Sequence, residues 1–230
     1  MATHTLSILK PSVNNLTARI FVRAAGLDYD ELDVWGKKST PEFLAKDPAD
    51  LTPLLEEAGL PRGALFESCA IMQYLCNKHG LDRFYPSDPG ERAMVDSAMF
   101  YLIGTLYPLV ARATYPTLGF AQYAGEVGTS AADDEMKAKA QRDAAAALAG
   151  PLEVYRTFFL EGKPFIGGDT PSIADIRFAA TLEFLRAIDY DLPPWVEDYM
   201  AATETALGDA YSEPAADVRG YIDHVRSQSA

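Results

Sequence analysis

The sequence predicts a small α/β domain followed by a larger, all-helical domain. Three observations support this division. Short strand-like and helix-like segments alternate over the first third of the chain. A run rich in proline and glycine, Tyr85 to Gly90, then interrupts the pattern. Beyond it, only helical spacing of apolar residues is found. The first domain would hold about 85 residues, within the ordinary size range of domains.

The elements of the first domain follow from apolar spacing and from turn residues. In chain order we expect a strand at 5–9, a helix over 14–25, a strand over 29–35, a short helix from Pro41, a hairpin of 54–55 with 64–66, and a helix over 68–78. In the second strand, alternation places Leu32 and Val34 on one face and Glu31 and Asp33 on the other. This alternation predicts the second strand of the domain.

This order of elements also predicts the connectivity of the sheet. A strand-helix-strand unit joins parallel neighbours through a crossover, so the first two strands should be parallel. The hairpin then adds two antiparallel strands. The result is a mixed four-stranded sheet with βαβ-ββα order.

The second domain begins after the proline-rich run. We assign residues 1–83 to the first domain, 84–90 to a linker and 91–230 to the helical domain. Helices are expected at 91–107, 131–148, 172–188, 195–207 and 215–225. The segment 121–134, rich in Gly, Ala and Asp, is expected to be a loop.

Bulk composition excludes several classes of function. The net charge of the 230 residues is −13, which argues against nucleic acid or an anionic membrane as a partner. No membrane span, secretory signal or disulfide framework is expected, since the chain has two cysteines, Cys69 and Cys76. His4, His79 and His224 are too scattered to predict a metal site. A cytoplasmic location is the default expectation.

Three motifs point to chemistry or to local structure. Pro53 stands at the start of a predicted strand, where a cis bond or a simple edge proline are both possible. Glu67-Ser68 opens a helix, so the free N–H groups and the dipole could hold a carboxylate while Glu67 accepts from an ammonium group. Helix capping alone is the alternative. The pair Ser172 and Asp175 forms a capping box with a structural role.

In this order and spacing, the three motifs resemble the soluble, cytosolic-type glutathione transferase family. The signature is Glu67-Ser68-Cys69-Ala70-Ile71-Met72-Gln73-Tyr74-Leu75. The resemblance covers nearly the whole chain. It implies a thioredoxin-like first domain with a cis-proline, an all-α second domain, and glutathione as co-substrate without a metal.

The resemblance also implies which residues bind glutathione. The backbone of Thr52 and Pro53 would hold the cysteinyl part, and Glu67 with Ser68 would hold the γ-glutamyl head. Many members contact the glycine carboxylate through Lys or Gln at the position of Leu51. Lys38 is the expected substitute for that contact in this chain, and a solvated surface lysine is the alternative.

Catalysis in the family depends on a group just after the first strand. Ser12 falls where serine-type members carry their hydroxyl, and Asn14 where nu-like bacterial members carry an amide. The resemblance is therefore to bacterial-like members with a serine/asparagine site, theta-like or nu-like. No Cys lies in this segment, which argues against a mechanism with an enzyme thiol. Either side chain could lower the thiol pKa of glutathione by a hydrogen bond.

The second substrate would lie between the domains. Six residues of the first long helix are candidates for its walls: Phe100, Tyr101, Gly104, Tyr107, Arg112 and Tyr115. Ordinary core packing is the alternative and must hold for some of them. Attack of the glutathione thiolate on a small apolar electrophile is the predicted reaction, with a role in detoxification. Glutathione-dependent disulfide or peroxide reduction and a non-catalytic binding domain are the alternatives. The family also implies a homodimer.

Overall fold

The computed structural model describes residues 4–120 and 134–229. Its first domain contains the predicted mixed sheet, with β1 (His4–Ile8), β2 (Asp30–Asp33), β3 (Leu54–Glu57) and β4 (Ala64–Phe66) in the order β2-β1-β3-β4. Strand β1 is parallel to β2 and antiparallel to β3, and β3 is antiparallel to β4. The predicted connectivity is confirmed.

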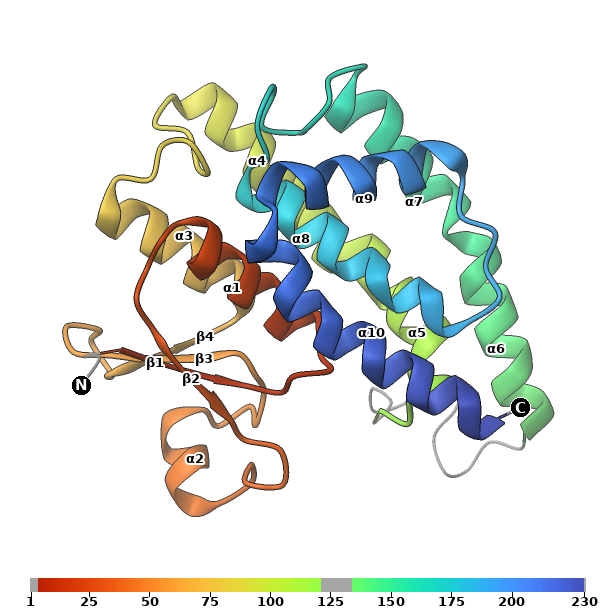
Figure 1. Cartoon of the computed structure of the whole chain (residues 1–230), viewed down its shortest axis with the longest axis horizontal. Helices are drawn as coiled ribbons and strands as arrows, with labels where there is room; N and C mark the ends of the chain where they lie inside the picture. The colour runs from red at the N-terminus through yellow and green to blue at the C-terminus, as the bar shows by residue number, and fades with distance from the viewer. Residues whose placement is uncertain (1–3, 121–133, 230) are drawn as a thin grey trace.

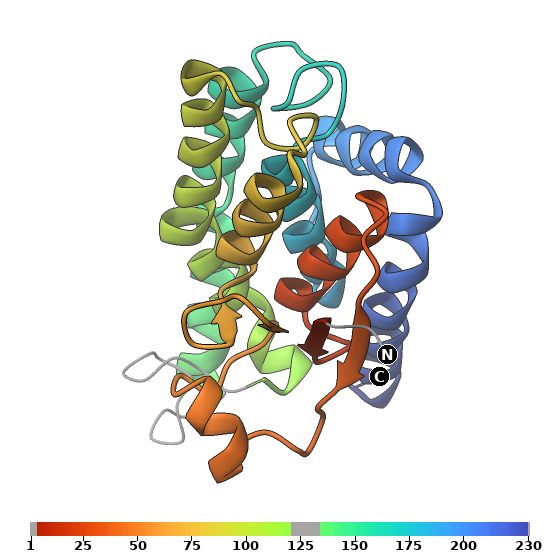
Figure 2. The same cartoon turned by 90° about the vertical axis from the view of Figure 1, so that its left-hand side faces the viewer.

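Three helices cover this sheet. Helices α1 (Val13–Ala24) and α3 (Ser68–His79) lie on one face, and α2 (Pro41–Lys46) lies on the other (Figure 1). Helices α1 and α3 run side by side, with their N-terminal ends toward the sheet (Figure 2). Ile71 and Leu75 of α3 are fully buried, as their spacing predicts.

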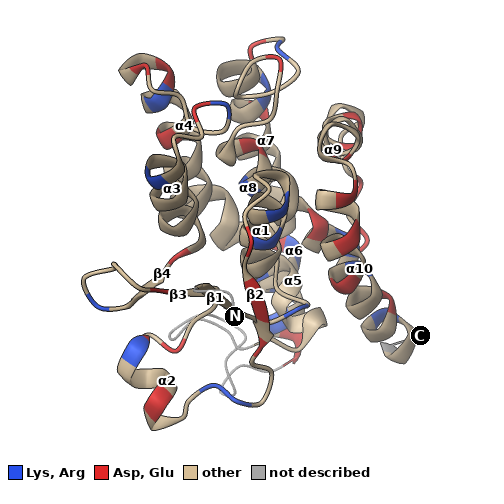
Figure 3. Ribbon diagram, turned by 60° about the vertical axis from the view of Figure 1, so that its left-hand side comes forward, with Lys and Arg blue, Asp and Glu red and all other residues tan. Residues whose placement is uncertain are grey.

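The two apolar residues that alternate in the second strand segment differ in burial. Val34 is buried, but Leu32 is 46% exposed because β2 is the edge strand. Glu31 turns toward α1 instead, where its carboxylate pairs with Arg19 (3.0 Å) and Arg23 (3.4 Å). Basic residues of α1 and acidic residues of β2 are neighbours in Figure 3. Ion pairing, which apolar alternation does not consider, sets the orientation of this strand.

The helical domain begins with one long helical run. It consists of α4 (Pro89–Tyr101), a π-helical turn η1 (Leu102–Leu106) and α5 (Tyr107–Leu118). It starts two residues earlier and extends further than predicted. By length and composition this run could cross a membrane, because one 18-residue window has a mean hydropathy of 1.4. A single helix of this kind is weak evidence, since the core helix of a soluble protein passes the same test.

The remaining helices enclose a common core. They are α6 (Asp134–Ala147), α7 (Ala149–Val154), η2 (Tyr155–Leu160), α8 (Ile173–Leu182), η3 (Glu183–Ala187), α9 (Pro194–Leu207) and α10 (Asp209–Ser229). Sequence spacing missed α7 and η2 and predicted a shorter α10. Most of the predicted loop at 121–134 lies outside the described residues.

The capping box at the start of α8 is present as predicted. The Ser172 N–H donates to Asp175 Oδ2 (2.8 Å), and Ser172 Oγ accepts from the Ala174 and Asp175 N–H groups. Asp175 is fully buried and also accepts from the Ile166 N–H (2.7 Å) and the Tyr199 hydroxyl (2.6 Å). Burial raises the pKa of Asp175, and these hydrogen bonds oppose that effect. One carboxylate thus joins α8, α9 and the loop before them.

The two domains share a core, and the predicted linker belongs to it. Phe84 and Tyr85 are buried, and the Phe84 carbonyl accepts from the Ile173 N–H (2.9 Å). Helix α1 packs against α8 and α10. Ion pairs of Arg19 with Asp217 (2.9 Å) and of Arg23 with Glu213 (2.7 Å) reinforce the contact with α10. The start of α1 is therefore fixed relative to the helical domain.

Candidate active site

A cavity of about 450 Å³ lies where the two domains meet. Its walls come from the start of α1, the loop before β3, the start of α3, the run η1–α5, and α8. The lining residues are Asn14, Leu51, Thr52, Pro53, Glu67, Ser68, Ile103, Tyr107, Pro108, Tyr115 and Arg177. Six of these eleven are residues that sequence analysis assigned to catalysis or to glutathione binding.

The loop before β3 presents unused backbone polar groups to this cavity. The Thr52–Pro53 peptide bond is cis. Asn15, a buried residue of α1, donates from Nδ2 to Thr52 Oγ1 (3.0 Å) and holds the loop in place. Among the described residues, the N–H and C=O of Thr52 have no hydrogen-bond partner. They can therefore pair with the extended backbone of a peptide ligand.

The start of α3 forms the second polar wall. Glu67 adopts φ +75°, a conformation rare for a residue with a side chain, and its carbonyl accepts the Ile71 N–H (2.9 Å) that opens the helix. Ser68 is the first helical residue and is buried. The free N–H groups and the helix dipole at this end favour an anion. The exposed Glu67 carboxylate beside them suits an ammonium group, so the wall fits an amino-acid head.

The start of α1 brings an amide to the cavity. Asn14 Nδ2 donates to the Tyr107 hydroxyl (2.8 Å), and Asn14 Oδ1 is buried without a partner among the described residues. Tyr107 and Tyr115 share a hydrogen bond of 2.5 Å between their hydroxyl oxygens. Both tyrosines follow the π-helical turn η1, a feature that changes which side chains a helix presents on a given face. Asn14, Tyr107 and Tyr115 thus form a polar chain across the domain boundary.

Comparison with known proteins agrees with this geometry. Residues 12–83 match the model of the glutathione S-transferase N-terminal domain, and residues 138–202 match that of the C-terminal domain. Together the two matches cover more than half of the chain.

The chain belongs to the glutathione S-transferase family.

Solved structures of other transferases are similar over nearly the full length. A delta-class glutathione transferase of Nilaparvata lugens is 28% identical, with 96% of this chain and 99% of that chain covered and a TM-score of 0.73. A Bombyx mori glutathione transferase is 27% identical, with 99% and 98% covered and a TM-score of 0.73. Human glutathione transferase theta-2, described in complex with glutathione, is 22% identical, with 98% and 91% covered and a TM-score of 0.79. At 22% identity, the likeness to this human protein shows a common fold and no more.

In this transferase, the two candidate catalytic residues differ in position. Ser12 is the N-cap of α1, and its carbonyl accepts the Leu16 N–H (2.8 Å). Its hydroxyl makes no capping bond, and Ser12 is not among the described residues that line the cavity. Asn14 lines it directly. Of the two candidates, Asn14 is therefore the one that the structure brings to the cavity.

Of the two residues proposed to lie near the glycine carboxylate, Leu51 and Lys38, only Leu51 lines the cavity among the described residues. Leu51 lines the cavity but offers only an apolar side chain and a backbone N–H already donated to Asp47 (2.7 Å). Lys38 does not line the cavity as far as the chain is described. Its ammonium group lies 3.9 Å from the Asp50 carboxylate, which also binds Ser39. Lys38 is thus held by Asp50, next to Leu51 in sequence.

Of the six residues predicted to hold the electrophile, the structure brings Tyr107 and Tyr115 to the cavity. Phe100 is 66% exposed, and Tyr101 packs against Tyr155 and Phe159 of the helical core instead. Gly104 and Arg112 are likewise not among the described lining residues. The prediction rested on the density of aromatic residues along the helix, which does not say which of them face the cavity. Ile103 and Pro108, which sequence analysis omitted, take the positions at the wall.

Arg177 is the lining residue that sequence analysis missed most plainly. It belongs to α8, and its guanidinium carbon lies 4.9 Å from the centre of the Tyr107 ring. A usable signal exists in the sequence: Arg177 is the one basic residue in the apolar run Ile173–Leu182. A charged side chain in a buried helix needs a reason.

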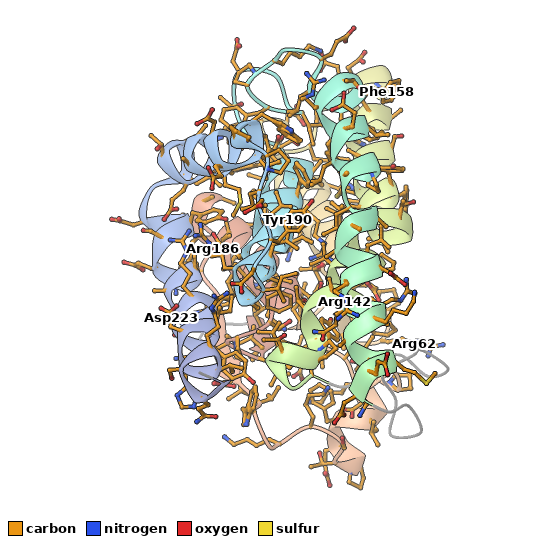
Figure 4. The ribbon with its side chains drawn as sticks, turned by 90° about the vertical axis from the view of Figure 1, so that its right-hand side faces the viewer. Arg62, Arg142, Phe158, Arg186, Tyr190 and Asp223 are labelled. Carbon is orange, nitrogen blue, oxygen red and sulfur yellow. The ribbon has the colours of Figure 1, made fainter. Side chains whose placement is uncertain are left out.

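A larger hollow of about 530 Å³ lies between α5, α6, η3 and α10. Arg142 of α6 and Arg186 of η3 are labelled on this side of the molecule in Figure 4. Its walls include several alanines, and Arg226, one of the lining residues, pairs with Asp189 (2.8 Å). None of the residues expected to bind glutathione lies there, so the smaller cavity is the candidate site of the transferase.

Proposed function

We propose that this protein activates the thiol of glutathione for attack on an apolar electrophile. The observation that carries the proposal is the convergence of two unlike walls in one cavity. Thr52, Glu67 and Ser68 suit a γ-glutamyl peptide, while the opposite wall contains Ile103 and Pro108. A peptide on the first wall would present its thiol to an apolar compound held on the second.

The reaction requires a thiolate at neutral pH. A free thiol has a pKa of about 8.5, so only a few per cent is ionised. A hydrogen bond from Asn14, with its amide held by Tyr107, and the dipole of α1 both stabilise the anion. Lowering the pKa by about two units needs about 2.7 kcal/mol of preferential stabilisation.

Reduction of disulfides or peroxides by two glutathione molecules is the alternative reaction. Cys69 and Cys76 are buried, and neither lines the cavity among the described residues. Burial raises the pKa of Cys69, and it raises that of Cys76 to about 12. These thiols are unsuited to form a mixed disulfide with the substrate. Reduction would therefore have to proceed without an enzyme thiol.

Parallel assays with a chloro-dinitrobenzene and a mixed glutathione disulfide separate the two reactions. We expect conjugation to exceed disulfide reduction, with saturation by glutathione. Disulfide reduction alone would support the alternative, and failure to bind glutathione at all would refute both reactions.

We further propose a cytoplasmic homodimer with a role in detoxification. Met94 and Phe100 of α4 are exposed apolar side chains, 40% and 66% accessible, on one helix. A second copy would remove such surface from water. Sedimentation analysis should give twice the chain mass of 25.1 kDa, and a single-chain mass would refute the dimer.

A further inference from the structure

Arg177 is a buried cation without a carboxylate partner in the part of the chain that the structure describes. Its side chain belongs to a residue that is 3% exposed. Its hydrogen bond is from one terminal nitrogen to Thr17 Oγ1 (3.3 Å), and its Nε has no partner among the described residues. No described carboxylate lies within 4.0 Å of its nitrogens.

The other deeply buried arginine of this region shows the contrast. Arg19 is also 3% exposed, but it pairs with Glu31 (3.0 Å) and with Asp217 (2.9 Å). Removing a charge from water costs several kcal/mol unless a counter-charge or hydrogen bonds compensate. At Arg177 the ring of Tyr107 compensates in part through a cation–π contact. The hydrogen bond to Thr17 and the interaction with the Cys69 thiol add to this, but both groups are neutral, so no described carboxylate balances the charge.

Arg177 links three of the other walls of the cavity to α8. It extends from α8 to Thr17 in the first turns of α1 and to Tyr107 at the start of α5. It also lies close enough to Cys69, next to Ser68 in α3, to oppose part of the rise that burial causes in the pKa of that thiol. The residue therefore contacts the elements that carry Asn14, Tyr107 and Ser68.

We propose that Arg177 is a positioning residue whose uncompensated positive charge favours the thiolate form of the bound thiol. This inference rests on the proposed function, because the thiolate of glutathione is the missing counter-charge. The guanidinium acts through Tyr107, which it holds by ring stacking and which in turn binds the Asn14 amide. It supplies a field rather than a direct contact to the reacting sulfur.

The titratable groups around Arg177 define what else could respond to pH. They are Cys69 on α3, Tyr107 on α5, Tyr155 on η2 and Glu67 across the cavity. Burial raises the pKa of Tyr155 well above its usual value and that of Cys69 as well. Neither group titrates near neutral pH. A change in the thiolate absorbance of an Arg177 variant near neutral pH therefore reports on the thiol of the ligand.

The test compares the thiol pKa of bound glutathione in Arg177→Met, Arg177→Lys and wild type, by ultraviolet thiolate absorbance. Arg177→Gln serves the same comparison if the methionine variant does not fold. Thr17→Val is the matched control, since it removes the hydrogen-bond acceptor of Arg177 and keeps the charge. We expect the neutral variants to raise the thiol pKa by about one unit, Arg177→Lys to restore most of the shift, and Thr17→Val to leave it unchanged.

A second arm measures the affinity for S-methylglutathione, which has both carboxylates and no ionisable thiol. We expect Arg177→Met to weaken the binding of glutathione about tenfold at a pH above the bound-thiol pKa. The affinity for S-methylglutathione should stay nearly unchanged. Equal losses for both ligands, or a thiol pKa that moves no more than in Thr17→Val, would overturn the proposal. If wild type itself does not bind glutathione, the proposed function fails instead of the role of Arg177.

Discussion

Replacing Tyr107 by Phe removes one oxygen atom from the centre of the polar chain that crosses the domain boundary. That oxygen accepts from Asn14 Nδ2 at 2.8 Å and shares a 2.5 Å hydrogen bond with the Tyr115 hydroxyl. Asn14 Oδ1 already lacks a partner among the described residues. In the variant the Asn14 amide would therefore lose its remaining hydrogen bond to the described residues.

The expected cost follows from these contacts. A net hydrogen bond contributes about 1 kcal/mol, and leaving a buried donor unpaired costs about 1–3 kcal/mol. We expect Tyr107→Phe to lower the free energy of unfolding by about 2 kcal/mol, which corresponds to a fall in Tm of about 4–8 °C for a chain of this size. Because the amide is then free to reorient, the thiol pKa of bound glutathione should rise as well.

Urea unfolding and thiolate absorbance measure the two effects in the same samples. Tyr101→Phe is the matched control, since Tyr101 lies on the same helical run, packs against Tyr155 and makes no hydrogen bond through its hydroxyl among the described contacts. It should change neither quantity. If Tyr107→Phe behaves like this control, the polar chain does not orient Asn14 and the reasoning is refuted.

Three further predictions follow from other contacts. Arg219→Met should lower the free energy of unfolding by about 3 kcal/mol, since the buried Glu183 carboxylate loses its closest cation (2.6 Å). The control is Arg156→Met, which removes the exposed pair of Arg156 with Glu153 and should not change urea unfolding. Arg219 also lowers the pKa of Glu204, so the stabilisation from the pair of Arg219 with Glu204 is present above about pH 4.5 and is lost as pH falls; acid titration of Arg219→Met should show a shallower loss than wild type, and parallel curves would contradict this account. Glu67→Gln should weaken the binding of glutathione about tenfold, because a charge-assisted hydrogen bond is lost. Calorimetry measures this affinity, and an unchanged value would place the γ-glutamyl head elsewhere. Finally, Cys69 and Cys76 should resist thiol reagents at pH 8 until the protein unfolds, because burial raises both pKa values; rapid labelling of the folded protein would refute their placement.

Most of the fold could be predicted because helices, strands and caps depend largely on residues that are close together in the sequence. Apolar spacing located α1 and α3, the crossover rule gave the parallel pair β1 and β2, and side-chain chemistry identified the capping box of Ser172 and Asp175. The ion pairs that Glu31 of β2 makes with Arg19 and Arg23 of α1 were not predicted, because they join two separate elements. Such pairings depend on tertiary contacts that periodicity does not contain.

The candidate site was predictable where a motif carries its own geometry. Thr52, Pro53, Glu67 and Ser68 converge in the cavity because each stands at an element boundary that the sequence marks. The wall from the helical domain was harder. The π-helical turn η1 changes which residues face the cavity, and it has no clear sequence signal. Arg177 was overlooked because only the folded structure shows that no described carboxylate lies beside its guanidinium group.

The central claim is that the cavity between the domains holds glutathione as a thiolate, with Asn14 as the nearer hydrogen-bond donor. A pH titration of bound-thiol absorbance in wild type, Asn14→Ala and Ser12→Ala tests it directly. We predict a wild-type pKa well below the free value of about 8.5, a rise toward that value in Asn14→Ala, and a smaller change in Ser12→Ala. A bound thiol that titrates in wild type as it does in free solution would contradict the account.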